Sequence, residues 1–239
     1  TYDLYAAAKT VAVFQVESTG MMDALRRMKP TCIEDIVALV ALYRPGPMDL
    51  IPDFCKRKHG EKFDYPDPRT EGILSETYGI MVYQEDVIKI AQHYGGLPAA
   101  DGDILRRAMS GKGRSLEALQ KVKDNFFECC ERQGHPLELS QEIYRQIESF
   151  AGYSFCKAHS ASYAVESYQS LYLKVHYPIE FMVAVINNQG GFYRTEVYVH
   201  EARMSGAAIH NPCVNKSEYE TTLYGTDVYL GLMHLEGLE

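Results

Sequence analysis

The stretch Asp103-Ile-Leu-Arg-Arg-Ala-Met-Ser-Gly-Lys-Gly-Arg-Ser115 is the part of this chain around which the rest is organised. No acid follows Asp103 within it, whereas the 239-residue chain has a formal net charge of −8. The stretch is therefore a local inversion of charge, and its four cations are Arg106, Arg107, Lys112 and Arg114. Its pattern predicts a short helix that ends in a flexible Gly-Lys-Gly turn.

This basic stretch has two interpretations. Arginine forks bind phosphate oxygens through paired hydrogen bonds and lysine supplies a mobile point charge, which favours a polyphosphate or nucleic-acid site. Cations are also favourable at any helix C-terminus, which would make the stretch an ordinary solvated helix end. The preceding Asp101-Gly-Asp103 run resembles a carboxylate pair for a metal, but we interpret Asp103 as the cap of the arginine helix.

Length and composition narrow the class of protein. The sequence begins at Thr1 rather than at Met, so we expect a piece of a longer protein with room for one large or two small domains. The acidic balance argues against a protein that coats DNA uniformly and leaves room for a local basic channel. The chain has no apolar run long enough for a bilayer and no signal-peptide pattern at its start.

The six cysteines have neither Cys-x-x-Cys nor zinc-finger spacing. We therefore expect reduced thiols in a cytoplasmic protein with no membrane partner.

Apolar periodicity predicts mostly helices. Ser18 caps a predicted helix that ends before Pro30, and Thr31 to Glu34 fits a capping box that opens the next one. From residue 207 the texture changes to short strands, with Tyr224 to Asp227 as a hairpin loop. The sequence predicts a mainly α fold, α+β overall, with a helical body over 1–188 and a β-containing C-terminal segment over 189–239.

The helix predicted after Lys157, which precedes it by one short step, runs to His176 and has two faces. At about 100° per residue, Tyr163, Glu166 and Ser170 lie within about 40° of the direction of His159. The opposite face is the expected core stripe, formed by Ala161, Ala164, Tyr168, Leu171, Tyr172 and Val175. An imidazole and a phenol one turn apart, with a lysine at the helix start, fit a surface that contacts a base pair. A solvated helix face explains them about equally well.

Arg44 follows the helix that the capping box opens. Pro45 disfavours a helical backbone at Arg44, and the Pro-Gly-Pro run holds a stiff turn. Arg44 is thus expected to be presented from a rigid, non-helical backbone, although an ordinary surface arginine in a loop would fit the same pattern.

Several long motifs, in order, resemble the fingers region of the bacterial DNA polymerase III alpha subunit, a C-family replicative DNA polymerase. The runs that carry the resemblance are Val13 to Ser18, Ala38 to Pro47, Tyr78 to Glu85, Leu105 to Met109, Lys157 to Tyr163 and Tyr168 to Pro178. The resemblance covers essentially the whole chain.

The resemblance implies DNA-templated nucleotidyl transfer by two Mg²⁺ ions, whose palm aspartates lie upstream of the fingers. We therefore expect no catalytic or metal-binding residue, and no activity, from these residues alone. The resemblance assigns nucleotide binding to Arg106, Arg107, Lys112 and Arg44. It assigns contact with the nascent base pair or DNA to Lys157, His159, Tyr163 and Arg114. The implied partners are primer-template DNA, dNTPs and, through segments elsewhere, a sliding clamp and other replicase subunits.

In this family a β-segment leads into helix-hairpin-helix modules. Here Glu239 stands where relatives often carry a second hairpin glycine after Gly237, which puts backbone contact with phosphate in doubt. Two other functions remain open. One is a non-catalytic DNA- or nucleotide-binding module with the same fold, and the other is a helical protein-interaction domain.

Overall fold

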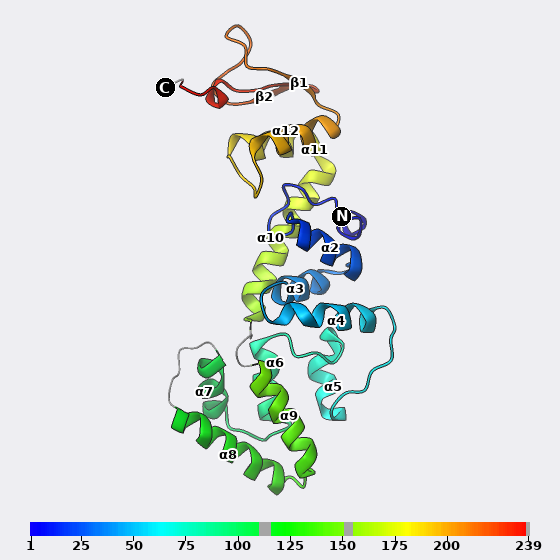
Figure 1. The fold of residues 1–239 in the computed structure, drawn as a ribbon, viewed down its shortest axis with the longest axis vertical. Coiled ribbons are helices and arrows are strands. Elements are labelled where there is room, and N and C mark those ends of the chain that lie inside the picture. Colours follow the sequence, from blue (N-terminus) through cyan, green and yellow to red (C-terminus); the bar gives the residue numbers. More distant parts are fainter. Residues whose placement is uncertain (110–115, 151–154, 238–239) are drawn as a thin grey trace. The chain divides into compact units, whose positions relative to one another are not determined.

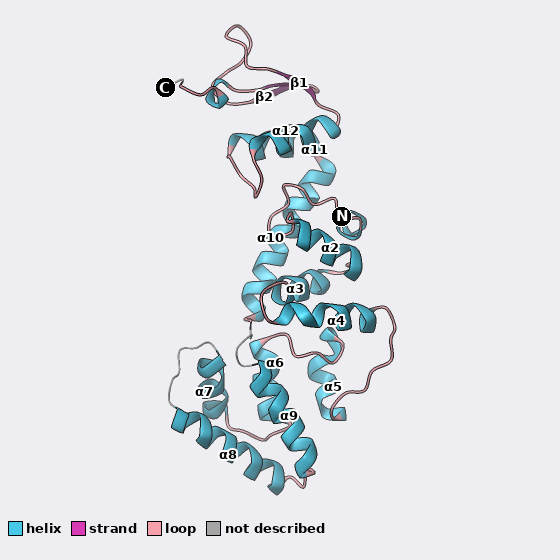
Figure 2. Cartoon of the chain, in the orientation of Figure 1, coloured by secondary structure: helices cyan, strands magenta, loops and turns pink. Residues whose placement is uncertain are grey.

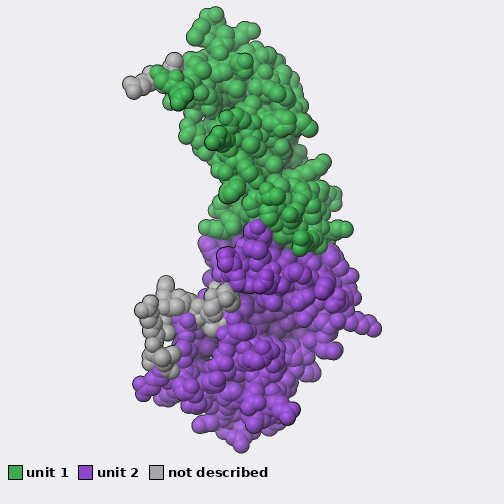
Figure 3. Space-filling model, viewed as in Figure 1, with its two compact units in different colours: residues 1–31, 163–239 green, residues 32–162 purple. Residues whose placement is uncertain are grey.

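The computed structural model describes residues 1–109, 116–150 and 155–237. Their secondary structure is mainly helical, with a small sheet near the C-terminus, which confirms the predicted fold class (Figures 1 and 2). The chain divides into two compact units, residues 1–31 with 163–239 and residues 32–162 (Figure 3). The domain boundary expected between residues 188 and 189 stays a prediction.

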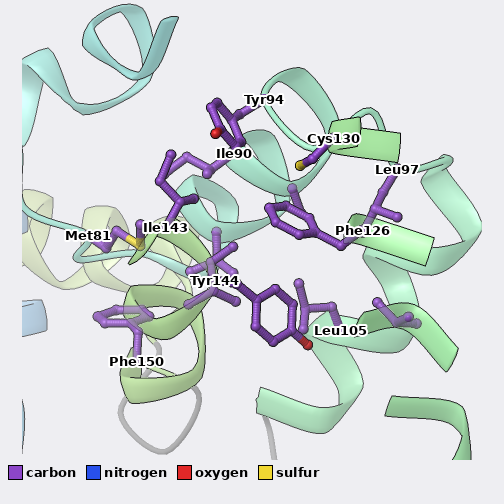
Figure 4. Close-up of a cluster of buried hydrophobic side chains, with 14 of the residues drawn as sticks. Met81, Ile90, Tyr94, Leu97, Leu105, Phe126, Cys130, Ile143, Tyr144 and Phe150 are labelled. Carbon is purple, nitrogen blue, oxygen red and sulfur yellow. The ribbon is translucent and has the colours of Figure 1, made fainter. Parts of the chain in front are cut away.

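The unit of residues 32–162 is helical. Its elements are α3 (Ile33–Leu42), η1 (Pro47–Leu50), α4 (Ile51–Lys58), α5 (Pro68–Leu74), η2 (Ser75–Thr77), α6 (Gln84–His93), α7 (Ala99–Met109), α8 (Leu116–Arg132), α9 (Leu137–Phe150) and the start of α10 (Lys157–His176). One core cluster joins α6, α7, α8 and α9, and it includes Ile90, Leu105, Phe126, Ile143 and Tyr144 (Figure 4).

Helix α3 is buried along almost its whole length, because its residues from Ile36 to Leu42 are apolar. It begins one residue later than expected. Cys32 is the N-cap, and the Asp35 carboxylate accepts a hydrogen bond from the Cys32 backbone N–H (3.3 Å). Asp35 also pairs with Lys58 of α4 across 2.8 Å, and both side chains are more than nine-tenths buried. This buried pair ties the first turn of α3 to the last turn of α4.

The unit of residues 1–31 and 163–239 combines helices with the sheet. It contains α1 (Tyr2–Ala6), α2 (Thr19–Met28), the rest of α10, α11 (Pro178–Asn187), α12 (Thr195–Met204), β1 (Ala208–His210), β2 (Thr222–Tyr224), β3 (Asp227–Tyr229) and η3 (Leu232–His234). The predicted hairpin is confirmed, because β2 and β3 pair antiparallel. The sequence did not reveal β1, which pairs parallel to β3 in the order β1-β3-β2.

A buried carboxylate organises this second unit. Glu17 accepts hydrogen bonds from the Ala12 backbone N–H (2.9 Å), the Tyr198 hydroxyl (3.0 Å) and the Phe192 backbone N–H. Tyr198 and Val228 belong to the same apolar cluster. Glu17 therefore connects the segment before α2 to the segment around α12.

The buried face of α10 differs in part from the expected stripe. Ala164 and Leu171 are buried as predicted, whereas Tyr172 is 45% exposed. The remaining buried positions of α10 are polar ones, namely Ser160, Ser167 and Lys174. Each of them is satisfied within its own unit, for example by the hydrogen bond from the Ser160 hydroxyl to the Val37 carbonyl oxygen.

Candidate nucleic-acid interface

The N-terminus of α10 is anchored on the N-terminus of α6. Tyr83 and Phe155 form a parallel β-bridge, and the Gln84 N–H donates to the Phe155 carbonyl oxygen (2.9 Å). The Lys157 backbone N–H donates to the Glu85 carboxylate (3.0 Å). Predicted site residue Lys157 is therefore held by its backbone as well as by its side chain.

The Lys157 side chain lies between an aromatic ring and an acid. Its ammonium lies 5.3 Å from the centre of the Tyr83 ring and forms an ion pair with Glu76. The side chain stays 36% exposed. An anion could therefore reach this ammonium, but it would compete with the Glu76 carboxylate for it.

Arg44 occupies the turn after α3, as expected. Its Nε donates to the Ala41 carbonyl oxygen (3.0 Å), and its guanidinium carbon lies 4.5 Å from the centre of the Phe155 ring. Burial lowers the pKa of Arg44, which nevertheless remains a cation at neutral pH. The Arg44 guanidinium thus places a positive charge against the ring of Phe155, two residues before Lys157.

Phe155 also connects Arg44 to His159. The Phe155 and His159 rings lie 5.4 Å apart, and His159 is exposed on the first turn of α10. The structure therefore brings together three of the predicted residues, Arg44, Lys157 and His159. We call this group, with Phe155 and Tyr83, the cation–aromatic cluster.

Sequence reasoning missed the residues that support this cluster. They are Tyr83, Phe155 and the two acids Glu76 and Glu85. The acids are 81 and 72 residues away from Lys157 in the sequence, so local pattern carries no signal for their pairing. The run from Tyr78 to Glu85 does belong to a motif of the resemblance, which is the one clue that the sequence offered.

Arg106 and Arg107 lie in the last described turns of α7. Both form ion pairs of 2.8 Å with Asp103, and both side chains stay about half exposed or more. The hydrogen bond from Arg106 lowers the pKa of the Asp103 carboxyl below its usual range. Asp103 was wrongly expected to cap this helix. The helix begins at Ala99, so Asp103 lies inside it, one turn before the arginines.

One acid thus faces two arginines, which leaves a net positive charge at this end of α7. Lys112 and Arg114, the other two predicted cations, lie outside the described residues.

Tyr163 falls in the unit of residues 1–31 and 163–239, whereas His159 falls in the other unit. The Tyr163 ring packs edge-on against Phe14 at 5.3 Å, and the Phe14 N–H donates to the Ser170 hydroxyl (3.3 Å). The expected polar face of α10 is therefore partly covered at Tyr163 and Ser170. His159, one turn earlier, is exposed.

The described part of the chain also lacks the features of a metal site, a disulfide or a membrane-spanning helix. Its residues include no group of three or more His, Cys, Asp or Glu side chains arranged to hold a metal ion. The six cysteines all lie in described segments and form no disulfide, in agreement with the expected reduced thiols. No described helix combines the length and apolar character that a bilayer crossing requires.

Fold and site together define a mainly helical chain with a partly exposed cation–aromatic cluster and a basic helix end. Residues 1–134 match the family of the bacterial DNA polymerase III alpha subunit finger domain, and the chain belongs to this family.

Curated relatives extend the match over essentially the whole chain, and each is a DNA polymerase III subunit alpha. The chain is 45% identical to that of Neisseria meningitidis over 93% of its length, and 43% identical to that of Treponema pallidum over 100%. It is 39% identical to that of Thermus aquaticus over 97% of its length. The chain spans about a fifth of the length of these relatives, covering 19–20% of each.

Proposed function

We propose that this chain is the fingers part of a bacterial replicative DNA-directed DNA polymerase, and that it positions the incoming dNTP and the nascent base pair. The observation that carries the proposal is the match to curated DNA polymerase III alpha subunits over 93–100% of the chain. The cation–aromatic cluster and the basic end of α7 supply groups suited to phosphates and bases.

Arg106 and Arg107 are the proposed ligands of the triphosphate. The resemblance also assigns nucleotide binding to Arg44 and to Lys112, which lies outside the described residues. The guanidinium forks of Arg106 and Arg107 match phosphate oxygens, and charge-assisted hydrogen bonds of this kind are stronger than neutral ones. Such groups also neutralise charge that develops on the leaving pyrophosphate, which accelerates the transfer itself. Asp103 forms ion pairs with both arginines, so the triphosphate has to compete with one carboxylate.

Lys157, His159, Tyr163 and Arg114 are the proposed contacts to the nascent base pair and the DNA. The exposed His159 ring offers a surface for stacking and a hydrogen-bonding edge for a base. Lys157 is held by Glu76 and Tyr83 and suits a backbone phosphate. Primer-template DNA and dNTPs are thus the proposed partners of this part of the polymerase. Contacts with a sliding clamp and other replicase subunits are assigned to other segments.

The two Mg²⁺ ions of nucleotidyl transfer do not fit the described residues. Two-metal sites need clustered carboxylates, and the described part of the chain has no such cluster. We assign the metal ligands to the palm of the polymerase, and we expect this chain alone to be inactive.

The triphosphate role is tested by Arg107→Ala in the complete polymerase, by single-turnover primer extension at varied dNTP concentration. Losing a charge-assisted phosphate contact costs about 1.5–3 kcal/mol, or roughly ten- to over a hundredfold in kpol/Kd. Arg145→Ala is the matched control, because Arg145 of α9 is an exposed arginine paired to Glu142 at i,i+3. A loss with Arg107→Ala alone, at unchanged DNA binding, supports the proposal. Equal values for both variants contradict it.

A further inference from the structure

The residue before helix α10, Cys156, is of a type that caps helices poorly. The Cys156 carbonyl oxygen accepts the first intrahelical hydrogen bond, from the Ser160 N–H (3.1 Å), which makes Cys156 the N-cap. The first N–H groups of a helix need acceptors, and Ser, Thr, Asp or Asn side chains ordinarily provide them at this position. The start of α10 therefore needs an acceptor from elsewhere.

Glu85 of α6 provides this acceptor. One carboxylate oxygen accepts from the Lys157 N–H at 3.0 Å, and the other lies 3.6 Å from the Cys156 sulfur. A negative charge at a helix N-terminus also interacts favourably with the helix dipole. Glu85 thus does for α10 what a local cap does for most helices, across 72 residues of sequence.

The start of α6, from which Glu85 projects, is itself held in place by hydrogen bonds. The next residue, Asp86, is buried and accepts hydrogen bonds from the Tyr83 N–H (3.0 Å) and the Val82 N–H (3.3 Å). The Gln84 N–H donates to the Phe155 carbonyl oxygen on the other side of the contact. Glu85 therefore projects from a constrained helix start, so its carboxylate has a fixed position. That position in turn fixes the backbone of Lys157.

We propose that Glu85 is a positioning residue for the polymerase reaction, which caps α10 from α6 and so holds Lys157 and His159 where they meet DNA or nucleotide. This inference rests on the proposed function, because it assumes that the start of α10 faces the substrates. It adds a residue that contacts no substrate and acts through the backbone of Lys157.

The test uses the complete polymerase and single-turnover primer extension at varied dNTP concentration. Losing a helix cap corresponds to about a fivefold to tenfold drop in kpol/Kd for Glu85→Ala, if the whole cap contribution reaches the transition state. Glu85→Gln keeps an oxygen that accepts the same hydrogen bond, and we expect it to retain most of the activity. Glu131→Ala on α8 is the control, because Glu131 is an exposed acid of the same unit.

A local cap provides the decisive rescue. In a Glu85→Ala background, Cys156→Asp places a carboxylate on the N-cap residue itself, where it accepts from the second or third helical N–H and caps the same first turn. We therefore expect kpol/Kd to recover to within about twofold of wild type. A direct role of Glu85 in substrate binding predicts no recovery, and that result would overturn the proposal. Hydrogen exchange at α10 amides, read in the same variants, should rise with Glu85→Ala and fall again in the double variant.

Lys157→Ala, measured in parallel, separates this inference from the function on which it rests. If Lys157→Ala lowers kpol/Kd and Glu85→Ala equals wild type, the positioning role is wrong while the proposed function stands. If neither variant differs from wild type in kpol/Kd, both the positioning role of Glu85 and the proposed function of this site are wrong. If both lower kpol/Kd and only the local cap restores the Glu85→Ala enzyme, the positioning role is supported.

Discussion

Lys58→Met is expected to open the turn that carries Arg44. Lys58 and Asp35 pair at 2.8 Å with side chains only 8% and 4% exposed, and the pair joins the two helices that flank this turn. Burial alone would lower the pKa of Lys58, but the hydrogen bond and charge of Asp35 outweigh it, so the pKa is raised. Lys58→Met leaves the Asp35 charge buried without its partner, which costs about 3–5 kcal/mol.

That cost can be measured locally by hydrogen exchange in the complete protein. A loss of about 3–5 kcal/mol lowers the protection of α3 amides by roughly 10²- to over 10³-fold, if they exchange through opening of this pair. The control is Lys56→Met on the same helix, because Lys56 pairs with Asp53 at 3.5 Å and both side chains are more than half exposed. Such a pair contributes about 0–1 kcal/mol. Equal protection in the two variants would refute the reasoning.

Three further predictions follow from buried or paired acids. Burial raises the pKa of Asp86 to about 6. Between about pH 4 and 6 the folded state therefore binds more protons than the unfolded state, and the free energy of unfolding falls as pH rises, by up to about 3 kcal/mol. Asp86→Asn should flatten this pH dependence in urea titrations at several pH values. Glu17→Ala leaves three donors without their acceptor and should cost at least about 3 kcal/mol, read as faster proteolysis at residues 188–194, and unchanged cleavage would contradict this. Glu76→Gln removes the acid beside Lys157, so DNA affinity should rise severalfold at low salt and converge with wild type at high salt, and a fall in affinity would contradict this.

Elements with strong local signals were predictable from the sequence. Ser18 accepts a hydrogen bond from the Met21 N–H at the start of α2, as its position before an apolar-periodic run predicts. The β2–β3 hairpin follows from two strand-like runs around Tyr224 to Asp227. In both cases the residues that determine the element lie within a few positions of one another.

Features that depend on distant partners were not predictable. The serines at 160 and 167 of α10 look polar in sequence, yet they are buried, because the Val37 carbonyl oxygen and the Tyr5 hydroxyl satisfy them. Strand β1 pairs with a strand 19 residues further on, at Ala208 and Asp227, and carries little pattern in its three residues.

The candidate site shows the same division. Arg44, Lys157 and His159 were chosen from motifs. The structure places Arg44 and His159 against Phe155, and Lys157 against Tyr83, which forms a β-bridge with Phe155. The acids that hold Lys157 come from segments 72 and 81 residues away, so no local spacing indicates them.

The most direct test of the proposed function follows hydrogen exchange in the complete polymerase bound to DNA. A primer ending in a dideoxynucleotide allows the correct dNTP to bind without incorporation, and exchange is compared with and without that dNTP. The account predicts slower exchange in the last described turns of α7, at residues 103–109, and in the first turns of α10, at residues 157–163. It predicts no change in α9, at residues 137–150. Nucleotide binding that leaves α7 and α10 unchanged would contradict the account.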